Sequence, residues 1–207
     1  MNNNSGAILV LSGPSGAGKS TLLNEVINDI GECYFSISTT TRPIRKAELD
    51  GVHYHFVSEE EFKQDIEEDM FLEYAHVHGN YYGTSIKPVK HALKAGKLVI
   101  FDIDVQGNSV VTNRLGDITT SVFISPPTLS ELKHRLEARK TDSKEVIERR
   151  VKMAKKEIQR ICEYDFLIVN DDLKIAAKAL RDIAKAARLK IPGNEINEFT
   201  YRWEDID

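Results

Sequence analysis

The sequence predicts a three-layer α/β/α fold around a mainly parallel sheet, and three observations lead to this prediction. Apolar runs such as Ala7–Leu11 and Leu98–Phe101 alternate along the chain with amphipathic segments of helical period. A glycine-rich turn joins the first run to the first of these segments. The stretch from Tyr34 to Tyr82 breaks the alternation, because it is strand-rich and hairpin-like. Continuous apolar runs are typical of strands buried on both faces, and strands that alternate with helices form parallel sheets.

The first apolar run is expected to be a strand, and a helix should follow from Lys19 to Ile30, where Gly31 ends it. In the strand-rich stretch, CYFSISTTTR and HYHFVS are interpreted as strands. Ser58 is a good N-cap, and Glu61 three residues later completes a capping box, so a helix should begin there.

The next segment, FLEYAHVHGNYYGT, is typical of a hairpin with Gly79 and Asn80 at its turn. Beyond it, strands and helices alternate. We expect a helix in IKPVKHALKA, a strand in KLVIFD, a helix over 108–115, a strand in TSVFISPP, a helix over 128–138, a long basic helix over 144–161, a strand in YDFLIVND and an amphipathic helix in LKIAAKALRDIAKAARL.

The composition favours a globular cytoplasmic protein. The hydrophobic fraction of 41% is enough for a buried core, and the formal net charge of -4 argues against a nucleic-acid partner. No apolar stretch reaches the length of a membrane span or of a signal peptide's core, so no membrane partner is expected. Cys33 and Cys162 stand in no metal or redox spacing, and we expect free thiols.

The residues GPSGAGKST directly after the first apolar run match the full P-loop pattern. Glycines let backbone N–H groups surround an anion, and the following helix directs its positive end to the same place. Lys19 is expected to reach the β- and γ-phosphates of a nucleoside triphosphate. The predicted triphosphate-binding residues are Gly13, Pro14, Ser15, Gly16, Ala17, Gly18, Lys19, Ser20 and Thr21.

A magnesium ion is expected to accompany the triphosphate. The Ser20 hydroxyl is the P-loop ligand, and a carboxylate at the end of another strand usually supports the metal. Asp102 ends the run LVIFD, and Asp104 follows it. Ser20 and Asp102 are therefore the predicted Mg²⁺ ligands, together with the nucleotide phosphates.

The P-loop alone does not identify the acceptor of the phosphoryl group. The chain has no N-K-x-D motif of a GTPase switch, and its 207 residues are few for a helicase or an AAA ATPase. Between Lys133 and Arg160 the chain has eleven Lys and Arg residues against five Asp and Glu residues. A basic segment in that position suits the arginine-bearing lid of a nucleoside monophosphate kinase.

Several segments resemble the guanylate kinase family: SISTTTRPIRKAELDGVHYHFVS, FLEYAHVHGNYYGTS, FDIDVQG, SPP after a strand, and LIVNDDL. The resemblance covers residues 6–189 and implies one P-loop NTPase-type domain. Its core would comprise 6–33, 84–130 and 160–189, with a strand-rich GMP-binding insertion over about 34–83 and a helical lid over about 131–159. Residues 190–207 form a tail outside the resemblance.

The resemblance also implies the acceptor site. In it Glu73 accepts hydrogen bonds from guanine N1–H and N2–H₂, while Ser38 and Thr84 donate to O6 or N7. The arginines and tyrosines of the set bind the GMP phosphate, because an arginine fork grips phosphate through two bonds. The implied GMP-binding residues are Ser38, Arg42, Arg45, Tyr54, Glu73, Tyr82, Thr84, Asp102 and Asp104.

The basic segment matches the lid of that family. Three of its arginines would close over the triphosphate and stabilise charge on the transferring group. The catalytic residues implied are Lys19, Arg42, Arg135, Arg139 and Arg150. Asn170 matches a position that contacts the adenine end of ATP. One departure is Ala138-Arg139-Lys140, where many relatives have Gly-Arg-Gly, so the backbone beside the arginine is stiffer here.

The resulting prediction is a guanylate kinase that converts ATP and GMP into ADP and GDP with Mg²⁺, in the cytoplasm, as a monomer or a homodimer. GMP and dGMP are the expected acceptors. One alternative is a non-catalytic module that binds a phosphopeptide in the GMP cleft, which the intact Lys19 and Ser20 argue against. Another is a kinase of the same fold for an acceptor such as a ribose bisphosphate, which Glu73 with Ser38 and Thr84 argues against.

Overall fold

Nearly the whole chain is described by the computed structural model, which covers residues 6–45, 48–77, 79–138 and 142–190, together with Ile196, Thr200 and Trp203. The elements in chain order are β1 (Ala7–Ser12), α1 (Lys19–Val26), β2 (Cys33–Phe35), β3 (Thr39–Thr40), β4 (His55–Phe56), α2 (Glu59–Glu67), β5 (Phe71–Val77), β6 (Asn80–Ser85), α3 (Ile86–Lys94), β7 (Leu98–Asp102), α4 (Val105–Leu115), η1 (Gly116–Ile118), β8 (Thr119–Ser125), α5 (Leu129–Ala138), α6 (Lys144–Glu157), η2 (Ile158–Glu163), β9 (Phe166–Val169) and α7 (Leu173–Ala187).

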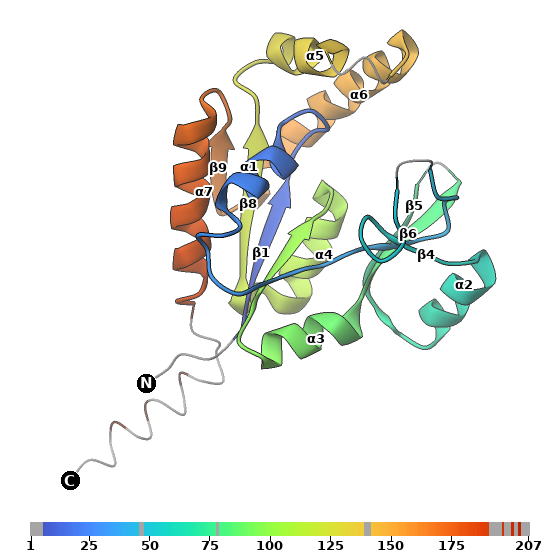
Figure 1. Ribbon diagram of the computed structural model, residues 1–207, viewed down its shortest axis with the longest axis vertical. Helices are drawn as coiled ribbons and strands as arrows, with labels where there is room; N and C mark the ends of the chain where they lie inside the picture. The colour runs from blue at the N-terminus through green and yellow to red at the C-terminus, as the bar shows by residue number, and fades with distance from the viewer. Residues whose placement is uncertain are drawn as a thin grey trace.

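The central sheet has five strands in the order β2-β7-β1-β8-β9, and every neighbouring pair is parallel. Leu9 and Leu11 of β1 point into a core shared with α1 and α7, whereas Ile8 and Val10 point into a core shared with α3 and α4. Helices therefore cover both faces of the sheet (Figure 1), which explains why β1 is buried throughout and apolar as far as Leu11. The predicted three-layer α/β/α fold is confirmed.

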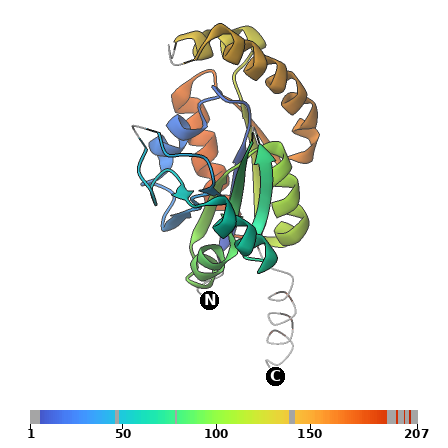
Figure 2. The same ribbon diagram turned by 90° about the vertical axis from the view of Figure 1, so that its right-hand side faces the viewer.

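A second sheet of four strands, in the order β4-β3-β6-β5, stands beside the central one (Figure 2). Helix α2 closes this sheet through Phe62, whose ring stacks on Phe71 at a centroid distance of 4.4 Å and on Tyr81 at 5.3 Å. The helix begins at the predicted capping box, in which Ser58 and Glu61 each bond the other's backbone N–H.

Helices α5 and α6 pack against each other beyond the carboxyl ends of β1 and β8 (Figure 1). Their common core consists of Leu132 and Leu136 from α5 and Ile147 and Ala154 from α6. This small core is separate from the two cores of the sheet, and it lies against the phosphate loop, since a Cβ at Gly16 would be 3.1 Å from side-chain carbons of both Leu132 and Leu136.

Two boundaries differ from the prediction because strand pairing is non-local. CYFSISTTTR forms two strands in two sheets: β2 pairs with β7, whereas β3 pairs with β6. In the hairpin, Asn80 pairs with Val77 and belongs to β6, rather than to the turn as predicted. Gly79 adopts a φ of 82°, which favours glycine at that place.

Two helices end earlier than expected. Helix α1 ends at Val26, although Ile30 remains buried and Gly31 has the expected positive φ of 81°. The predicted basic helix over 144–161 divides into α6 and the 3₁₀ helix η2. The 3₁₀ helix has fewer residues per turn than the α-helix, and it leads into β9.

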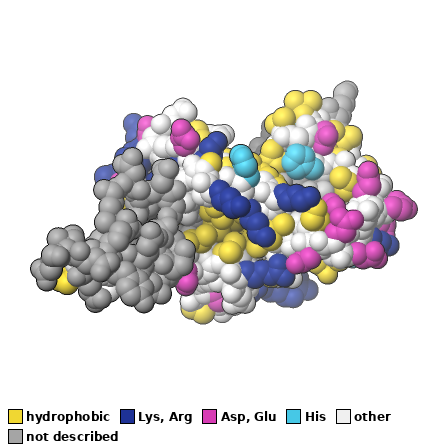
Figure 3. All heavy atoms as spheres, turned by 90° about the horizontal axis from the view of Figure 1, so that it is seen from below, with side chains coloured by type: hydrophobic (Ala, Val, Ile, Leu, Met, Phe, Trp, Pro, Cys, Tyr) yellow, Lys and Arg dark blue, Asp and Glu magenta, His cyan; other side chains and the backbone are white. Residues whose placement is uncertain are grey.

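Charge is unevenly spread over the surface. In the view from below, Lys and Arg side chains gather across the middle and acidic side chains at one end (Figure 3). Helix α3 contributes exposed Lys87, Lys90 and Lys94, while the first turn of α2 is acidic.

Among the described residues, no helix is both long and apolar enough to span a membrane. Most of the tail 190–207 lies outside the described residues; Ile196 and Trp203 within it are exposed.

Candidate active site

The phosphate loop connects β1 to α1 and depends on two glycines. Gly13 has a φ of 135°, and a Cβ there would lie 2.0 Å from the carbonyl oxygen of Ile124. Gly18 is the N-cap of α1 with a φ of 91°, and a Cβ there would lie 2.4 Å from Nδ2 of Asn170. No other amino acid fits either place without displacing a neighbour, so the loop keeps its backbone N–H groups turned inward.

The loop encloses a small polar cavity of about 140 Å³, lined by Pro14, Ser15, Gly16, Gly18, Lys19, Ser20 and Thr21. Lys19 folds back over it: its Nζ donates to the carbonyl oxygen of Gly13 at 2.8 Å. The same Nζ lies 3.6 Å from a carboxylate oxygen of Asp102 at the end of β7. A cation and the positive end of a helix thus face one cavity, which can hold an anion.

A second cavity of about 270 Å³ lies between the two sheets, lined by Ser38, Tyr54, Glu73, Ala75, Tyr82, Asp102, Ile103 and Asp104. Six of the predicted acceptor residues are among them. Asp102 belongs to this cavity and is also the carboxylate beside Lys19. The Lys19–Asp102 pair therefore links the two cavities, since Lys19 lines one and Asp102 lines the other, and groups bound in them would meet near this pair.

Glu73 is aimed into the larger cavity by an irregularity of β5. The pairing of β5 with β6 shifts register between Phe71 and Glu73, which is typical of a β-bulge that redirects a side chain. Thr84, directly opposite on β6, donates its hydroxyl proton to Oε1 of Glu73 at 2.6 Å. Burial raises the pKa of the Glu73 carboxyl above its ordinary value, and the Thr84 hydrogen bond opposes that shift. A hydroxyl has one proton to donate, and Thr84 donates it to Glu73. Thr84 is not among the residues that line the cavity, so its contact in this structure is with Glu73 rather than with the cavity.

Of the four predicted phosphate ligands, the two tyrosines line this cavity and the two arginines do not. Tyr54 and Tyr82 meet edge to face at 6.0 Å, and both line it. The Arg42 guanidinium lies over the Tyr54 ring at 5.4 Å, so its charge is held next to the cavity wall. Arg45 is exposed, and its backbone N–H donates to Glu48. Arg42 and Arg45 do not line the cavity in the described part of the chain.

The lid arginines approach the phosphate loop from two helices. Arg150 of α6 donates to the Ser15 hydroxyl at 2.5 Å and lies 3.4 Å from Asp142. Arg135 of α5 donates to Glu131 and, at 3.0 Å, to the backbone carbonyl of Asn170. Arg139 lies outside the described residues. The two described arginines thus contact the loop or its direct neighbour.

Asn170 lies beneath the loop rather than in an open cleft. Its side chain is only 6% exposed, and its Nδ2 donates to the carbonyl oxygen of Ala17 at 2.9 Å. This contact fixes the loop at the residue before Gly18. The predicted contact of Asn170 with adenine remains a prediction.

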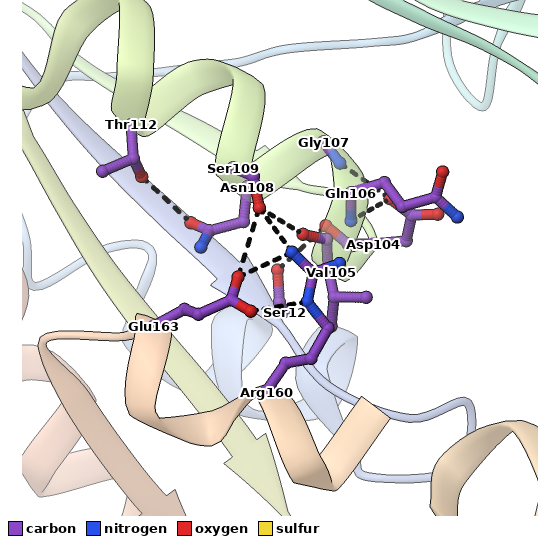
Figure 4. A network of polar contacts seen from close by, with 10 residues as sticks. All are labelled: Ser12, Asp104, Val105, Gln106, Gly107, Asn108, Ser109, Thr112, Arg160 and Glu163. Atoms are coloured by element: carbon purple, nitrogen blue, oxygen red, sulfur yellow. Dashed lines mark hydrogen bonds and ion pairs between the residues drawn. The ribbon is translucent and has the colours of Figure 1, made fainter. Parts of the chain in front are cut away.

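The start of α4 borders the larger cavity through Asp104. Asp104 is its N-cap, and its carboxylate accepts from the backbone N–H groups of Gln106 and Gly107 at 2.9 and 2.8 Å (Figure 4). Near it, Arg160 donates to Ser109 at 2.6 Å and pairs with Glu163 (Figure 4). These contacts join the end of the helix pair to α4, and hence to the Asp104 side of the larger cavity.

The groups expected to hold Mg²⁺ are a hydroxyl and a carboxylate, both of which are ligands that this ion prefers. Ser20 is exposed at the start of α1, and Asp102 stands across from it beside Lys19. Burial raises the pKa of the Asp102 carboxyl and the Lys19 cation opposes the shift. Among the described residues no group of three or more His, Cys, Asp or Glu could hold a metal ion.

Two carboxylates near the site were not predicted from the sequence. Glu48 pairs with Arg42, and the only signal for it was an acidic residue within a basic loop. Glu157 is the last residue of α6, and its carboxyl interacts electrostatically with Lys19 and Asp104. Burial raises the pKa of this carboxyl, the Lys19 cation opposes that shift, and the Asp104 carboxylate adds to it. No sequence pattern distinguished Glu157 from the other charges of its helix.

Comparison with known proteins gives a consistent result. The family model described as guanylate kinase matches residues 5–187. A guanylate kinase of Sulfurimonas denitrificans is 78% identical over 206 residues, covering 100% of both chains. One of Wolinella succinogenes is 52% identical over 204 residues, covering 99% of this chain and 95% of its own. Among solved structures, guanylate kinase from Anaplasma phagocytophilum has a TM-score of 0.72 at 33% identity, covering 90% of this chain and 88% of its own. With a family match over this range and relatives of this identity, the chain belongs to the guanylate kinase family.

Proposed function

We propose that this chain transfers the γ-phosphoryl group of ATP directly to the phosphate of GMP near the Lys19–Asp102 pair, which links the two cavities. As a member of its family, the chain is a nucleoside monophosphate kinase. The observation that carries the proposal is the position of Asp102, which lines the larger cavity and lies 3.6 Å from the P-loop lysine. A donor on the loop and an acceptor in the cavity would therefore have their phosphates side by side.

The acceptor base is read by Glu73. Its carboxylate faces the cavity, and a planar carboxylate can accept from guanine N1–H and N2–H₂ together. Adenine would present an unprotonated N1 to the same carboxylate, so a lone pair would meet a negative charge. Ser38 also lines the cavity and can donate to O6 or N7. Thr84 contributes by holding Glu73 through the 2.6 Å hydrogen bond.

The acceptor phosphate is bound at the rim by Tyr54, Tyr82, Arg42 and Arg45. The two tyrosine hydroxyls and the two guanidinium groups offer donors to the phosphate oxygens, and the arginines also offset its charge. Held there, an oxygen of the GMP phosphate attacks the γ-phosphorus, one P–O bond forms as the bond to the ADP oxygen breaks, and no covalent enzyme intermediate is needed.

The donor side supplies charge. Lys19, with the backbone N–H groups of the loop, would bind the β- and γ-phosphates, and Arg135, Arg139 and Arg150 would stabilise charge on the group in transfer. Ser20 and Asp102 would hold Mg²⁺ with the nucleotide, and the ion neutralises phosphate charge when bound. Closure of the lid, about 131–159, and of the insertion, about 34–83, over the core would exclude water as a competing acceptor.

The substrates we propose are ATP with GMP or dGMP, in the cytoplasm, for a chain that is a monomer or a homodimer. The comparisons do not favour the two alternatives, a phosphopeptide-binding module and a kinase for a ribose bisphosphate.

A coupled ADP-release assay across GMP, dGMP, AMP, UMP and CMP tests the proposal. We expect turnover with GMP and dGMP. The value of kcat/KM for AMP should be lower by about 10⁴, since a pocket whose carboxylate accepts from guanine N–H groups rejects a base that lacks these donors. A parent enzyme that uses AMP as well as GMP would contradict the assignment of the base pocket. ADP release that does not depend on any nucleoside monophosphate would contradict the transfer itself.

A further inference from the structure

The Arg42 side chain is held on several sides by neighbouring residues. Its Nη2 donates to both carboxylate oxygens of Glu48, at 2.7 and 2.9 Å, and its Nη1 donates to the carbonyl oxygen of Pro43 at 2.8 Å. Its guanidinium also lies over the rings of Tyr54 and Phe56, at 5.4 and 5.7 Å. A long arginine side chain would otherwise sample many rotamers, so these contacts select one.

Glu48 also holds the backbone of the same loop. Its Oε2, which accepts from Arg42, accepts from the backbone N–H of Arg45 at 2.9 Å. One carboxylate thus joins the side chain of the first arginine to the main chain of the second. The paired Arg42 and Glu48 side chains are 13% and 15% exposed, so the pair is largely removed from water. The ion pair with Arg42 and the backbone bond lower the pKa of the Glu48 carboxyl, which therefore stays charged at neutral pH.

The arrangement leaves Arg42 able to bind a second anion. A guanidinium has five N–H donors, and the contacts with Glu48 and Pro43 occupy three of them. The Tyr54 ring beneath the guanidinium belongs to the wall of the acceptor cavity. Arg42 is therefore presented at the rim with donors to spare, rather than being covered by its partner.

We propose that Glu48 is a positioning residue for the acceptor phosphate: it fixes Arg42 and the backbone at Arg45 in the geometry that binds GMP. This inference rests on the proposed function. The opposite role, an anion that competes with the phosphate for Arg42, fits less well because the contacts with Glu48 and Pro43 leave guanidinium N–H donors unused. The negative charge of Glu48 repels the incoming phosphate. However, because Glu48 already holds the Arg42 guanidinium in one conformation, GMP binding does not have to supply the entropy cost of ordering that side chain.

A double-mutant cycle tests the inference. Glu48→Gln keeps the shape of the side chain and one acceptor oxygen, but it removes the charge and the two-oxygen contact with Arg42. We expect kcat/KM for GMP to fall about tenfold, mainly through KM, because charge-assisted bonds that order the site are lost. The KM for ATP should not change. In an Arg42→Ala background the same substitution should change kcat/KM for GMP less than about twofold, since Glu48 acts through Arg42.

Three results would overturn the inference: an equal loss in both backgrounds, no loss in the parent background, or tighter GMP binding on removal of the charge. Glu59→Gln is the matched control, because Glu59 forms an exposed ion pair with Lys63 at 2.7 Å in the same insertion. If Glu48→Gln does not fold, as judged by thermal melting, Glu48→Asp replaces it, since its shorter side chain keeps the charge but breaks the two-oxygen contact. Turnover of GMP by the parent enzyme is measured first, so a failure of the proposed function is seen separately from a failure of the cycle.

Discussion

The phosphate loop and the acceptor cavity bind their ligands by opposite means. The loop is one continuous segment, residues 13–21, and it offers mainly backbone N–H groups. The cavity is lined by side chains from several separate segments, such as Ser38, Glu73 and Asp104. Backbone recognition depends on glycines at fixed places and is indifferent to many side chains, whereas side-chain recognition depends on tertiary structure to bring its groups together. Substitutions in the loop should therefore affect transfer, and substitutions in the cavity should affect the choice and affinity of the acceptor.

The largest effect is expected on the loop side, at its one essential side chain. Lys19→Ala should lower kcat by about 10³, because a cation on the transferring phosphate is lost. The affinity for GMP, measured by calorimetry without ATP, should stay within about twofold of the parent value if the phosphate loop contributes to transfer and not to acceptor binding. Lys94→Ala, at an exposed position that ends α3, is the control. A folded Lys19→Ala enzyme with normal turnover would exclude this loop as the donor site.

On the cavity side, Glu73→Gln should lower kcat/KM for GMP by about 10², since one acceptor becomes a donor that faces a guanine N–H. ATP binding should be unaffected. The exposed Glu67, at the end of α2, gives the control variant Glu67→Gln. If the Glu73 variant phosphorylates GMP as well as the parent does, another group reads the base.

Substitution of a lid arginine tests whether the lid contributes to transfer without contributing to the binding of GMP alone. Arg150→Ala removes the contact with Ser15 and should lower kcat about 30-fold, a moderate effect because other lid arginines share the charge. GMP affinity in the absence of ATP should not change. Arg149→Ala is a close control, as the neighbouring arginine is exposed. Weaker GMP binding with unchanged kcat would place Arg150 at the acceptor instead of the donor.

The smallest effect should be a change in pH dependence. Thr84→Val preserves shape but removes the hydrogen bond that lowers the pKa of Glu73, so that pKa should rise further. GMP binds to the ionised carboxylate, and binding is lost as the pH falls through this pKa. The acid limb of the kcat/KM profile should therefore move to higher pH, with a loss of only about fivefold well above it. An unchanged acid limb would mean that Thr84 does not tune Glu73.

The difference between the regions also explains what could be predicted from sequence. The phosphate loop was predictable because all its determinants are adjacent: the apolar strand, the glycines and the lysine. The three-layer fold followed from the alternation of strands and helices and is confirmed. The division of CYFSISTTTR between two sheets was not predictable, because it depends on pairing with β7 and β6, whose partner residues lie more than 40 residues further along the chain.

The acceptor residues were named from a family resemblance, and their mutual contacts required the structure. The hydrogen bond from Thr84 to Glu73 follows from strand register and a bulge, neither of which leaves a pattern in the sequence. The Arg42–Glu48 pair depends on the path of a loop. Sequence analysis supplied the chemical types of the groups, while the tertiary structure determines which donors are free and which are already used.

The hydrogen bond between Asn170 and Ala17 has a consequence for the order of folding. It joins residues 153 positions apart, and Asn170 follows β9, the final strand of the central sheet. A growing chain on the ribosome exposes the phosphate loop early, yet the side chain that holds the loop from beneath is synthesised more than a hundred residues later. Nascent chains that end before β9 should therefore bind no nucleotide, although they carry the whole P-loop sequence. The first functional segment to be synthesised is among the last to be completed.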